Sequence, residues 1–191
     1  MASAIEHDVG TKAGAEFNRH PGVDTRGSCV SGPYRWWSAK RGPALREFHW
    51  KGASPRLIAE QTGAIVSPNG AGGYLYYRSG DFIGIHNDPY GCELVVLTLL
   101  SGSVEPLHCY LHLADTPLAE IQILAEATNG LPEGGTAFDI STVPFLFSGQ
   151  RIPHHRAPRD RDSETILAVQ FYGLLLPLGT DALDRPSETH Q

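Results

Sequence analysis

Cysteine is scarce in this sequence. Only Cys29, Cys92 and Cys109 occur among 191 residues, and no two of them form a Cys-x-x-Cys pair. The sequence therefore indicates neither a disulfide framework nor a thiolate zinc site, and it favours a reducing, cytoplasmic compartment.

Long apolar runs are also missing. No stretch approaches the roughly 18 apolar residues that a membrane-spanning helix needs. The first residues, MASAIEHDVGTKAG, lack a basic segment followed by an apolar one. We expect a protein that is neither exported nor bound to a membrane.

Positive charge is not in excess, because the formal net charge is -6. A chain without a basic field is not expected to bind nucleic acid. Its length fits one domain. We predict a loosely held polar arm over residues 1–30, a single domain over residues 31–180 and a tail over residues 181–191, in a monomer or a homodimer.

Most of the remaining chain has the patterning of strands, with a few supporting helices. Residues 54–63 and 116–130 predict helices that begin at Ser54 and Thr116 as capping residues and end before Gly63 and Gly130. The segment 33–50, rich in tryptophan and basic residues, predicts either a helix packed on a sheet or a wall for substrate capture. The turn-forming segment SPNGAGG, residues 67–73, leads into the remaining strands. These are predicted within 74–78, 82–88, 92–100, 107–113, 144–149 and 164–173. This order predicts a mainly β fold with helices (α+β), a double-stranded β-helix of the jelly-roll, cupin-like kind.

One strand ends in a pair of side chains that suits metal binding. His86 and Asp88 are two residues apart in FIGIHNDPYG, so a strand would place them on one face, about 6 to 7 Å apart along the chain. RIPHHRAP supplies a further histidine before the last long strand. Two histidines and one carboxylate leave half of an octahedral ion open, as in non-haem Fe(II) sites. A zinc site also uses three protein ligands, so the residue types leave both metals possible.

From about Tyr74 to Tyr172 the chain resembles the Fe(II)/2-oxoglutarate-dependent dioxygenase superfamily, most closely its small prolyl-hydroxylase-like members. YYRSGDFIGIHND is similar to the family's Tyr-x-x-Gly segment with its His-x-Asp ligands, and PFLFSGQRIPHHRAP is similar to the strand that ends at the distal histidine. The flanking prolines favour His154 as the third ligand. His155 is the alternative. Only one of the two can be a ligand, since neighbouring strand residues face opposite sides.

The resemblance implies Fe(II), 2-oxoglutarate as cosubstrate, and O2. It also implies that Tyr77 contacts the cosubstrate, as does Thr98 unless it packs in the core. Members of the family usually carry a basic residue about nine to eleven positions after the distal histidine, where this chain has Ser163, Glu164 and Thr165. A buried carboxylate needs a cation or several donors, so we expect Arg161 to take this role.

The expected activity is hydroxylation, or another oxidation, of an unactivated C–H bond. The expected substrate is a small metabolite such as an amino acid or a secondary-metabolite precursor. Two alternatives stay open: a cupin-like protein that binds a metal or ligand without turnover, and a zinc-dependent hydrolase or isomerase on the same fold.

Overall fold

The computed structural model describes residues 16–20, 24–26, 29–51, 53–158, 160 and 162–176. Their helices and strands occur in the order β1 (Glu16–His20), β2 (Asp24–Arg26), β3 (Cys29–Ser31), β4 (Tyr34–Lys40), α2 (Pro43–Trp50), α3 (Ser54–Thr62), β5 (Ile65–Tyr77), β6 (Phe82–His86), β7 (Leu94–Ser101), β8 (Leu107–Cys109), the 3-10 helix η1 (Leu111–Leu113), α4 (Leu118–Ala127), β9 (Thr136–Phe138), β10 (Phe145–Phe147), β11 (His154–Arg156) and β12 (Thr165–Leu176).

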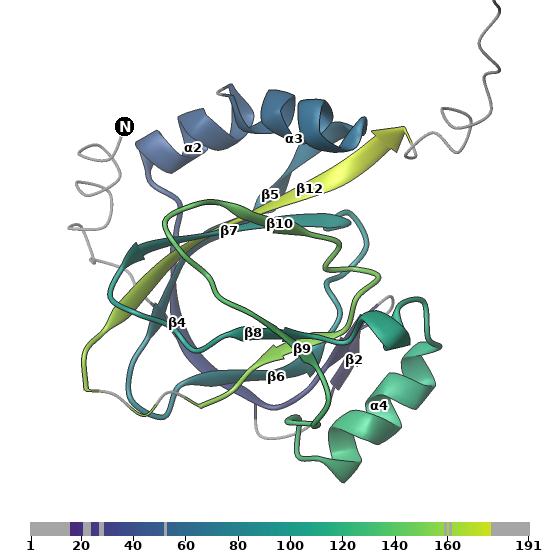
Figure 1. The fold of residues 1–191 in the computed structure, drawn as a ribbon. Coiled ribbons are helices and arrows are strands. Elements are labelled where there is room, and N and C mark those ends of the chain that lie inside the picture. Colours follow the sequence, from purple (N-terminus) through teal and green to yellow (C-terminus); the bar gives the residue numbers. More distant parts are fainter. Residues whose placement is uncertain are drawn as a thin grey trace, which may run out of the picture.

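The strands form one curled antiparallel sheet in the order β10-β7-β12-β5-β4-β6-β11-β8-β9. Figure 1 shows its two halves facing each other: β10, β7, β12 and β5 on one side, and β6, β11, β8 and β9 on the other. Neighbours in the sheet are mostly distant in sequence, as in a jelly roll. The predicted fold class is confirmed.

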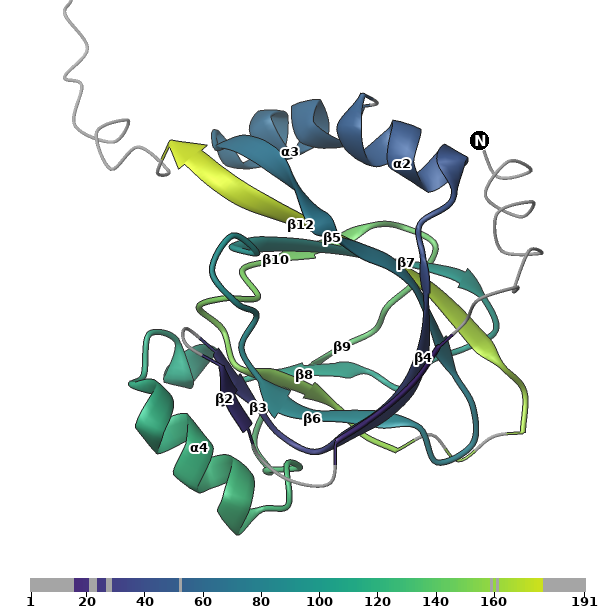
Figure 2. The same cartoon turned by 180° about the vertical axis from the view of Figure 1, so that it is seen from behind.

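Strand β4 joins the two halves and corrects the expectation of a helix over its residues. It pairs with β5 through Trp37 and Tyr76 and with β6 through Tyr34 and Ile83. Figure 2 shows it curving from one half to the other. Aromatic residues favour strands, and the edges of β5 and β6 are both available to pair with this segment. Only α2, which follows β4, is helical.

The turn between β5 and β6 anchors β4. The Asp81 carboxylate, 3 % exposed, accepts hydrogen bonds from the Arg35 Nε at 2.9 Å and from the Arg78 backbone N–H at 2.8 Å. A buried acceptor with two donors is costly to disturb. The segment YRSGD therefore positions β4 as well as turning the chain.

Helices cover the outside of the sheet. Helices α2 and α3 lie over β5 and β12, and α4 lies beside β6 (Figure 1). Helix α3 ends at Gly63 with φ of +72°, as predicted. The predicted caps were wrong: α3 begins after Ala53 and α4 after Pro117, neither with a side-chain cap. Ser54 is instead hydrogen bonded to the Tyr172 hydroxyl at 2.6 Å.

Two predicted boundaries differ from the structure. Residues 67–73 were expected to form a turn but lie within β5, which pairs with β12 along most of its length. A Cβ on Gly73 would lie 2.3 Å from the Ala39 carbonyl oxygen, so the glycine lets β4 approach β5. The expected strand over 107–113 ends at Cys109, and η1 follows. None of the described helices has the length and apolar character that a membrane-spanning helix requires.

Candidate metal centre

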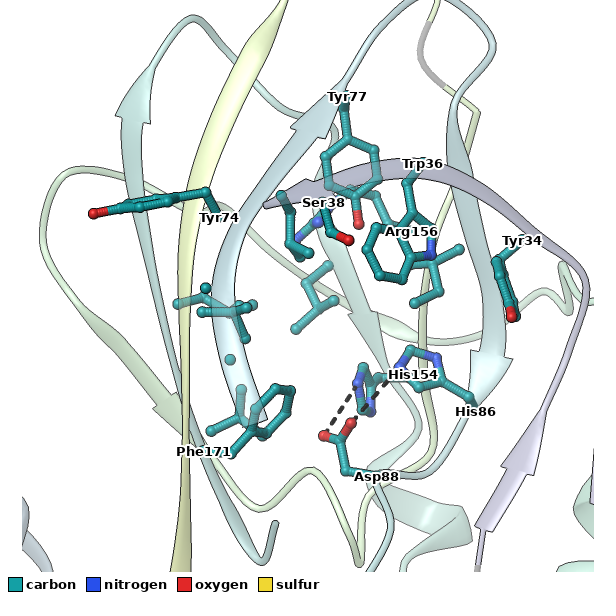
Figure 3. A pocket seen from close by; sticks show the side chains of 18 of the residues that line it. Tyr34, Trp36, Ser38, Tyr74, Tyr77, His86, Asp88, His154, Arg156 and Phe171 are labelled. Carbon is teal, nitrogen blue, oxygen red and sulfur yellow. Dashed lines mark ion pairs between the residues drawn. The ribbon is translucent and has the colours of Figure 1, made fainter. Parts of the chain in front are cut away.

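Strands β6 and β11 bring two histidines and one carboxylate together. The two strands are antiparallel neighbours, and His86 is the register partner of His154. The Asp88 carboxylate lies 4.0 Å from Nε2 of His86 and 3.8 Å from Nε2 of His154. One ligand atom from each of the three residues lies within 4.8 Å of the others. Figure 3 shows the three side chains converging at one end of a cavity.

Backbone carbonyls orient both imidazoles. Nδ1 of His86 is 2.9 Å from the Gly84 oxygen, and Nδ1 of His154 is 2.9 Å from the Ile152 oxygen. A carbonyl only accepts, so each Nδ1 carries the proton and each Nε2 keeps its lone pair. Hydrogen bonds of this kind are the usual support of metal-binding histidines.

The loop before β11 positions Asp88. The Asp88 backbone N–H donates to the Gly149 carbonyl at 3.0 Å, and the Asn87 side chain donates to the Gln150 carbonyl at 3.0 Å. A Cβ on Gly149 would lie 1.9 Å from Asp88 Oδ2. Only glycine therefore leaves room for this carboxylate. Sequence reasoning missed Gly149, because no local pattern shows which side chain faces it.

Without a cation, burial favours the neutral form of each of the three groups. It lowers the pKa of His86 to about 4 and raises the pKa of Asp88 to about 7. Burial, and then the neighbouring His86, hold the pKa of His154 well below its usual value. Oδ2 of Asp88 is buried and has no hydrogen-bond partner among the described residues. Neutral imidazoles and an unpaired carboxylate oxygen are what a divalent metal ion needs as ligands.

His155 points to the opposite side of β11. Its ring stacks on His108 with centroids 4.7 Å apart, and its Nδ1 lies 3.0 Å from the Tyr110 hydroxyl. The structure thus brings His154, and not His155, beside His86 and Asp88.

A cavity of about 480 Å³ extends from the three residues into the jelly roll. Arg156 lines it, follows His154 by two positions on β11, and is only 2 % exposed. Its guanidinium carbon lies 5.1 Å from the centroid of the Tyr77 ring. Nε and Nη2 of Arg156 have no hydrogen-bond partner among the described residues. The cavity therefore holds a buried cation that lacks a carboxylate partner.

The three residues that the sequence predicted to bind the cosubstrate differ in position. Tyr77, 1 % exposed, lines the cavity beside Arg156 (Figure 3). Thr98 lies on β7 between two residues that face inward, and it is not among the cavity-lining residues. Arg161 lies outside the described residues. Sequence reasoning missed Arg156, although its spacing of two from His154 predicts a shared face once β11 is recognised as a strand.

Strand β4 forms one wall of the cavity. Five of its residues line the cavity: Tyr34, Trp36, Ser38, Ala39 and Lys40. All of these except Ala39 alternate along the strand, as residues on one face must. The segment proposed for substrate capture therefore borders the same space as the three candidate ligands.

Comparison with solved structures identifies proteins of the same fold. HygX from Streptomyces hygroscopicus, solved with nickel, 2-oxoglutarate and hygromycin B, matches with TM-score 0.57 and 10 % identity over 92 % of this chain and 78 % of that one. An oxidoreductase of the 2OG-Fe(II) oxygenase family from Burkholderia pseudomallei matches with TM-score 0.53 and 12 % identity over 90 % and 77 %.

A third structure of this fold is SnoN, a non-haem α-ketoglutarate-dependent epimerase from nogalamycin biosynthesis. It matches with TM-score 0.58 and 13 % identity over 90 % of this chain and 72 % of that one. No protein-family model and no curated protein matches the sequence. The resemblance noted in the sequence therefore extends to the whole fold.

Proposed function

We propose that this protein is an Fe(II)- and 2-oxoglutarate-dependent oxygenase that oxidises a C–H bond of a small molecule. One observation carries the proposal: His86, Asp88 and His154 converge at one end of a cavity whose wall also holds the buried Arg156, a cation without a carboxylate partner among the described residues. The fold shared with HygX, which was solved with nickel and 2-oxoglutarate, supports the same chemistry.

His86, Asp88 and His154 would hold Fe(II) through two imidazole nitrogens and a carboxylate oxygen. Bound there, the metal would couple reduction of O2 to oxidative decarboxylation of 2-oxoglutarate, giving succinate and carbon dioxide while the substrate is oxidised. The protein's part is to orient ligands and to exclude water. Val95, Phe147 and Phe171 contribute apolar walls beside the centre.

Arg156 and Tyr77 would bind the far carboxylate of the cosubstrate. Arg156 follows His154 on the same face of β11, about 6 to 7 Å along the strand, so a short dicarboxylate can reach from the metal to the guanidinium. Pairing would satisfy a cation that is 2 % exposed. We therefore assign to Arg156 the role that the sequence predicted for Arg161.

The substrate is expected to be a small metabolite, such as an amino acid or a secondary-metabolite precursor. A cavity of about 480 Å³ falls within the range that holds small organic ligands. Because the Asp88 carboxylate supplies the third protein ligand, we do not expect a halide to take a ligand position. We therefore favour hydroxylation over halogenation. Desaturation and ring closure are further outcomes of the same chemistry.

Anaerobic titration of the metal-free protein with Fe(II) and then 2-oxoglutarate tests the proposal. An oxygenase gives a weak visible charge-transfer band, and air then yields succinate. Asp88→Ala should lose both signals, while His155→Gln, on the other face of β11, should keep them. Zinc binding without a band would indicate a hydrolase or isomerase, and a band without succinate would indicate a binding protein. Either result would contradict the proposal.

A further inference from the structure

Strand β4 lies outside the eight strands β5 to β12 that make up the jelly roll, yet it runs beside the cavity. Its register partners show this path: Tyr34 is opposite Ile83 on β6, and Lys40 is opposite Gly73 on β5. Both partners also line the cavity. Residues of β4 can therefore contact those parts of a substrate that lie beyond the reach of the metal ligands and of Arg156.

Lys40 ends this strand and is exposed. It shares the face of Trp36 and Ser38, which point into the cavity in Figure 3. Its ammonium group forms no ion pair or hydrogen bond with the residues that the structure describes. Lys40 is therefore available to a ligand.

The neighbouring cation, Arg41, is not available in this way. Its guanidinium donates to the carbonyl oxygens of Asn69 and Ala71, each at 3.2 Å, and to that of Gly70, and it contacts Nδ1 of His49 at 2.8 Å. These bonds fasten the start of α2 to β5. Arg41 therefore holds backbone segments together, whereas the Lys40 ammonium group is open to a ligand.

The charges around the cavity leave Lys40 unbalanced. Among the residues that the structure describes, the titratable lining residues other than histidines and tyrosines are Lys40, Asp88 and Arg156. A divalent metal with Asp88 and Arg156 carries two positive charges, which the two carboxylates of 2-oxoglutarate neutralise. Lys40 then keeps one uncompensated positive charge, in a chain whose formal net charge is -6. Such a local field attracts an anion.

We propose that Lys40 binds an anionic group of the substrate, so that the substrate is a small organic acid with an apolar body. The apolar body would pack on Leu75, Val169 and Phe171, which line the same space. This inference rests on the proposed function and specifies its substrate class. A charge-assisted hydrogen bond contributes about 1.5 to 3 kcal/mol, so the acid should bind at least about tenfold more tightly than its neutral amide.

Matched acids and amides test this inference without knowledge of the natural substrate. The anaerobic protein with Fe(II) and 2-oxoglutarate is titrated with 3-phenylpropanoate and 3-phenylpropanamide, with octanoate and octanamide, and with N-acetyl amino acids and their amides. Calorimetry gives each dissociation constant. At least one acid should bind about tenfold more tightly than its amide, and the preference should shrink at high ionic strength.

The variant Lys40→Met should abolish this preference and keep the Fe(II) and 2-oxoglutarate band. Lys51→Met is the matched control, because Lys51 is an exposed lysine that does not line the cavity. It should keep the preference for acids. If the wild-type protein shows the band but binds acids no better than amides, or if Lys40→Met keeps the preference, the inference is wrong. Absence of the band in the wild-type protein overturns the proposed function itself.

Discussion

His86 and His154 are register partners across β6 and β11, and their ring centroids are 4.1 Å apart. Both rings are held by a backbone carbonyl two residues earlier, so their Nε2 atoms face the same carboxylate. The sheet therefore preorganises the centre before any cation binds.

The two adjacent histidines of β11 should differ in metal binding. His154→Ala removes an Nε2 that lies 3.8 Å from Asp88, so bound Fe(II) should fall to the background level. His155→Ala changes the far side of the strand and should keep the iron content, with a modest loss of thermal stability because His155 is buried. Metal analysis of both purified variants measures this, and iron loss in the second variant alone would reverse the assignment.

Gly149→Ala should remove the metal site without unfolding the protein. The added Cβ would meet Asp88 Oδ2 at 1.9 Å and Val95 Cγ2 at 2.6 Å, so the carboxylate must move away from the histidines. We expect Fe(II) affinity to fall at least about tenfold. Calorimetric titration measures the affinity. Gly70→Ala is the control, since its Cβ would meet nothing within 4 Å, and equal affinities in the two variants would contradict the prediction.

Arg156→Met should stabilise the free protein and remove stabilisation by 2-oxoglutarate. A buried cation without a carboxylate partner among the described residues is replaced by an apolar side chain, which removes a desolvation penalty of several kcal/mol. In the wild-type protein with metal, cosubstrate at a hundred times its Kd should add about 2.7 kcal/mol to the free energy of unfolding.

Denaturant unfolding with and without 2-oxoglutarate measures both effects of Arg156→Met. The control is Arg78→Met, because Arg78 lies at the surface, where it pairs with Glu164 and contacts the Trp37 ring. If Arg156→Met is stabilised by 2-oxoglutarate as much as the wild-type protein, the cosubstrate cation lies elsewhere, and Arg161 becomes the better candidate.

The stability of the metal-free protein should depend on the ionisation of Asp88. Burial raises its pKa from 3.8 to about 7, so between these values the folded protein binds a proton that the unfolded chain releases. The free energy of unfolding therefore falls as pH rises through this interval. Asp88→Asn removes this contribution, so the variant should be more stable than the wild-type protein above about pH 7, on the order of a few kcal/mol.

Urea unfolding of the metal-free proteins across this pH range tests the prediction. The control is Asp115→Asn, since Arg151 lowers the pKa of the exposed Asp115 and no comparable gain at high pH is expected. A constant difference between Asp88→Asn and the wild-type protein from about pH 4 to pH 8 would show that Asp88 titrates normally.

Local patterns predicted much of the fold. Apolar runs identified the strands that became β7, β10 and β12, and the glycine at position 63 marked the end of α3. Two of the failures share a cause: Ser54 and residues 67–73 have local preferences that tertiary partners override. Ser54 bonds to Tyr172, and residues 67–73 pair largely with β12.

By itself the sequence determined the residue types and spacings of the centre. The step of two between His86 and Asp88, and the prolines around His154, are properties of the chain, because strand periodicity follows from local geometry. Only the tertiary structure decided that His154 rather than His155 faces Asp88, that Gly149 makes room for the carboxylate, and that Arg156 lines the cavity beside Tyr77. These facts depend on which segments pack against each other across the jelly roll, and such long-range packing has no signature in any short stretch of sequence.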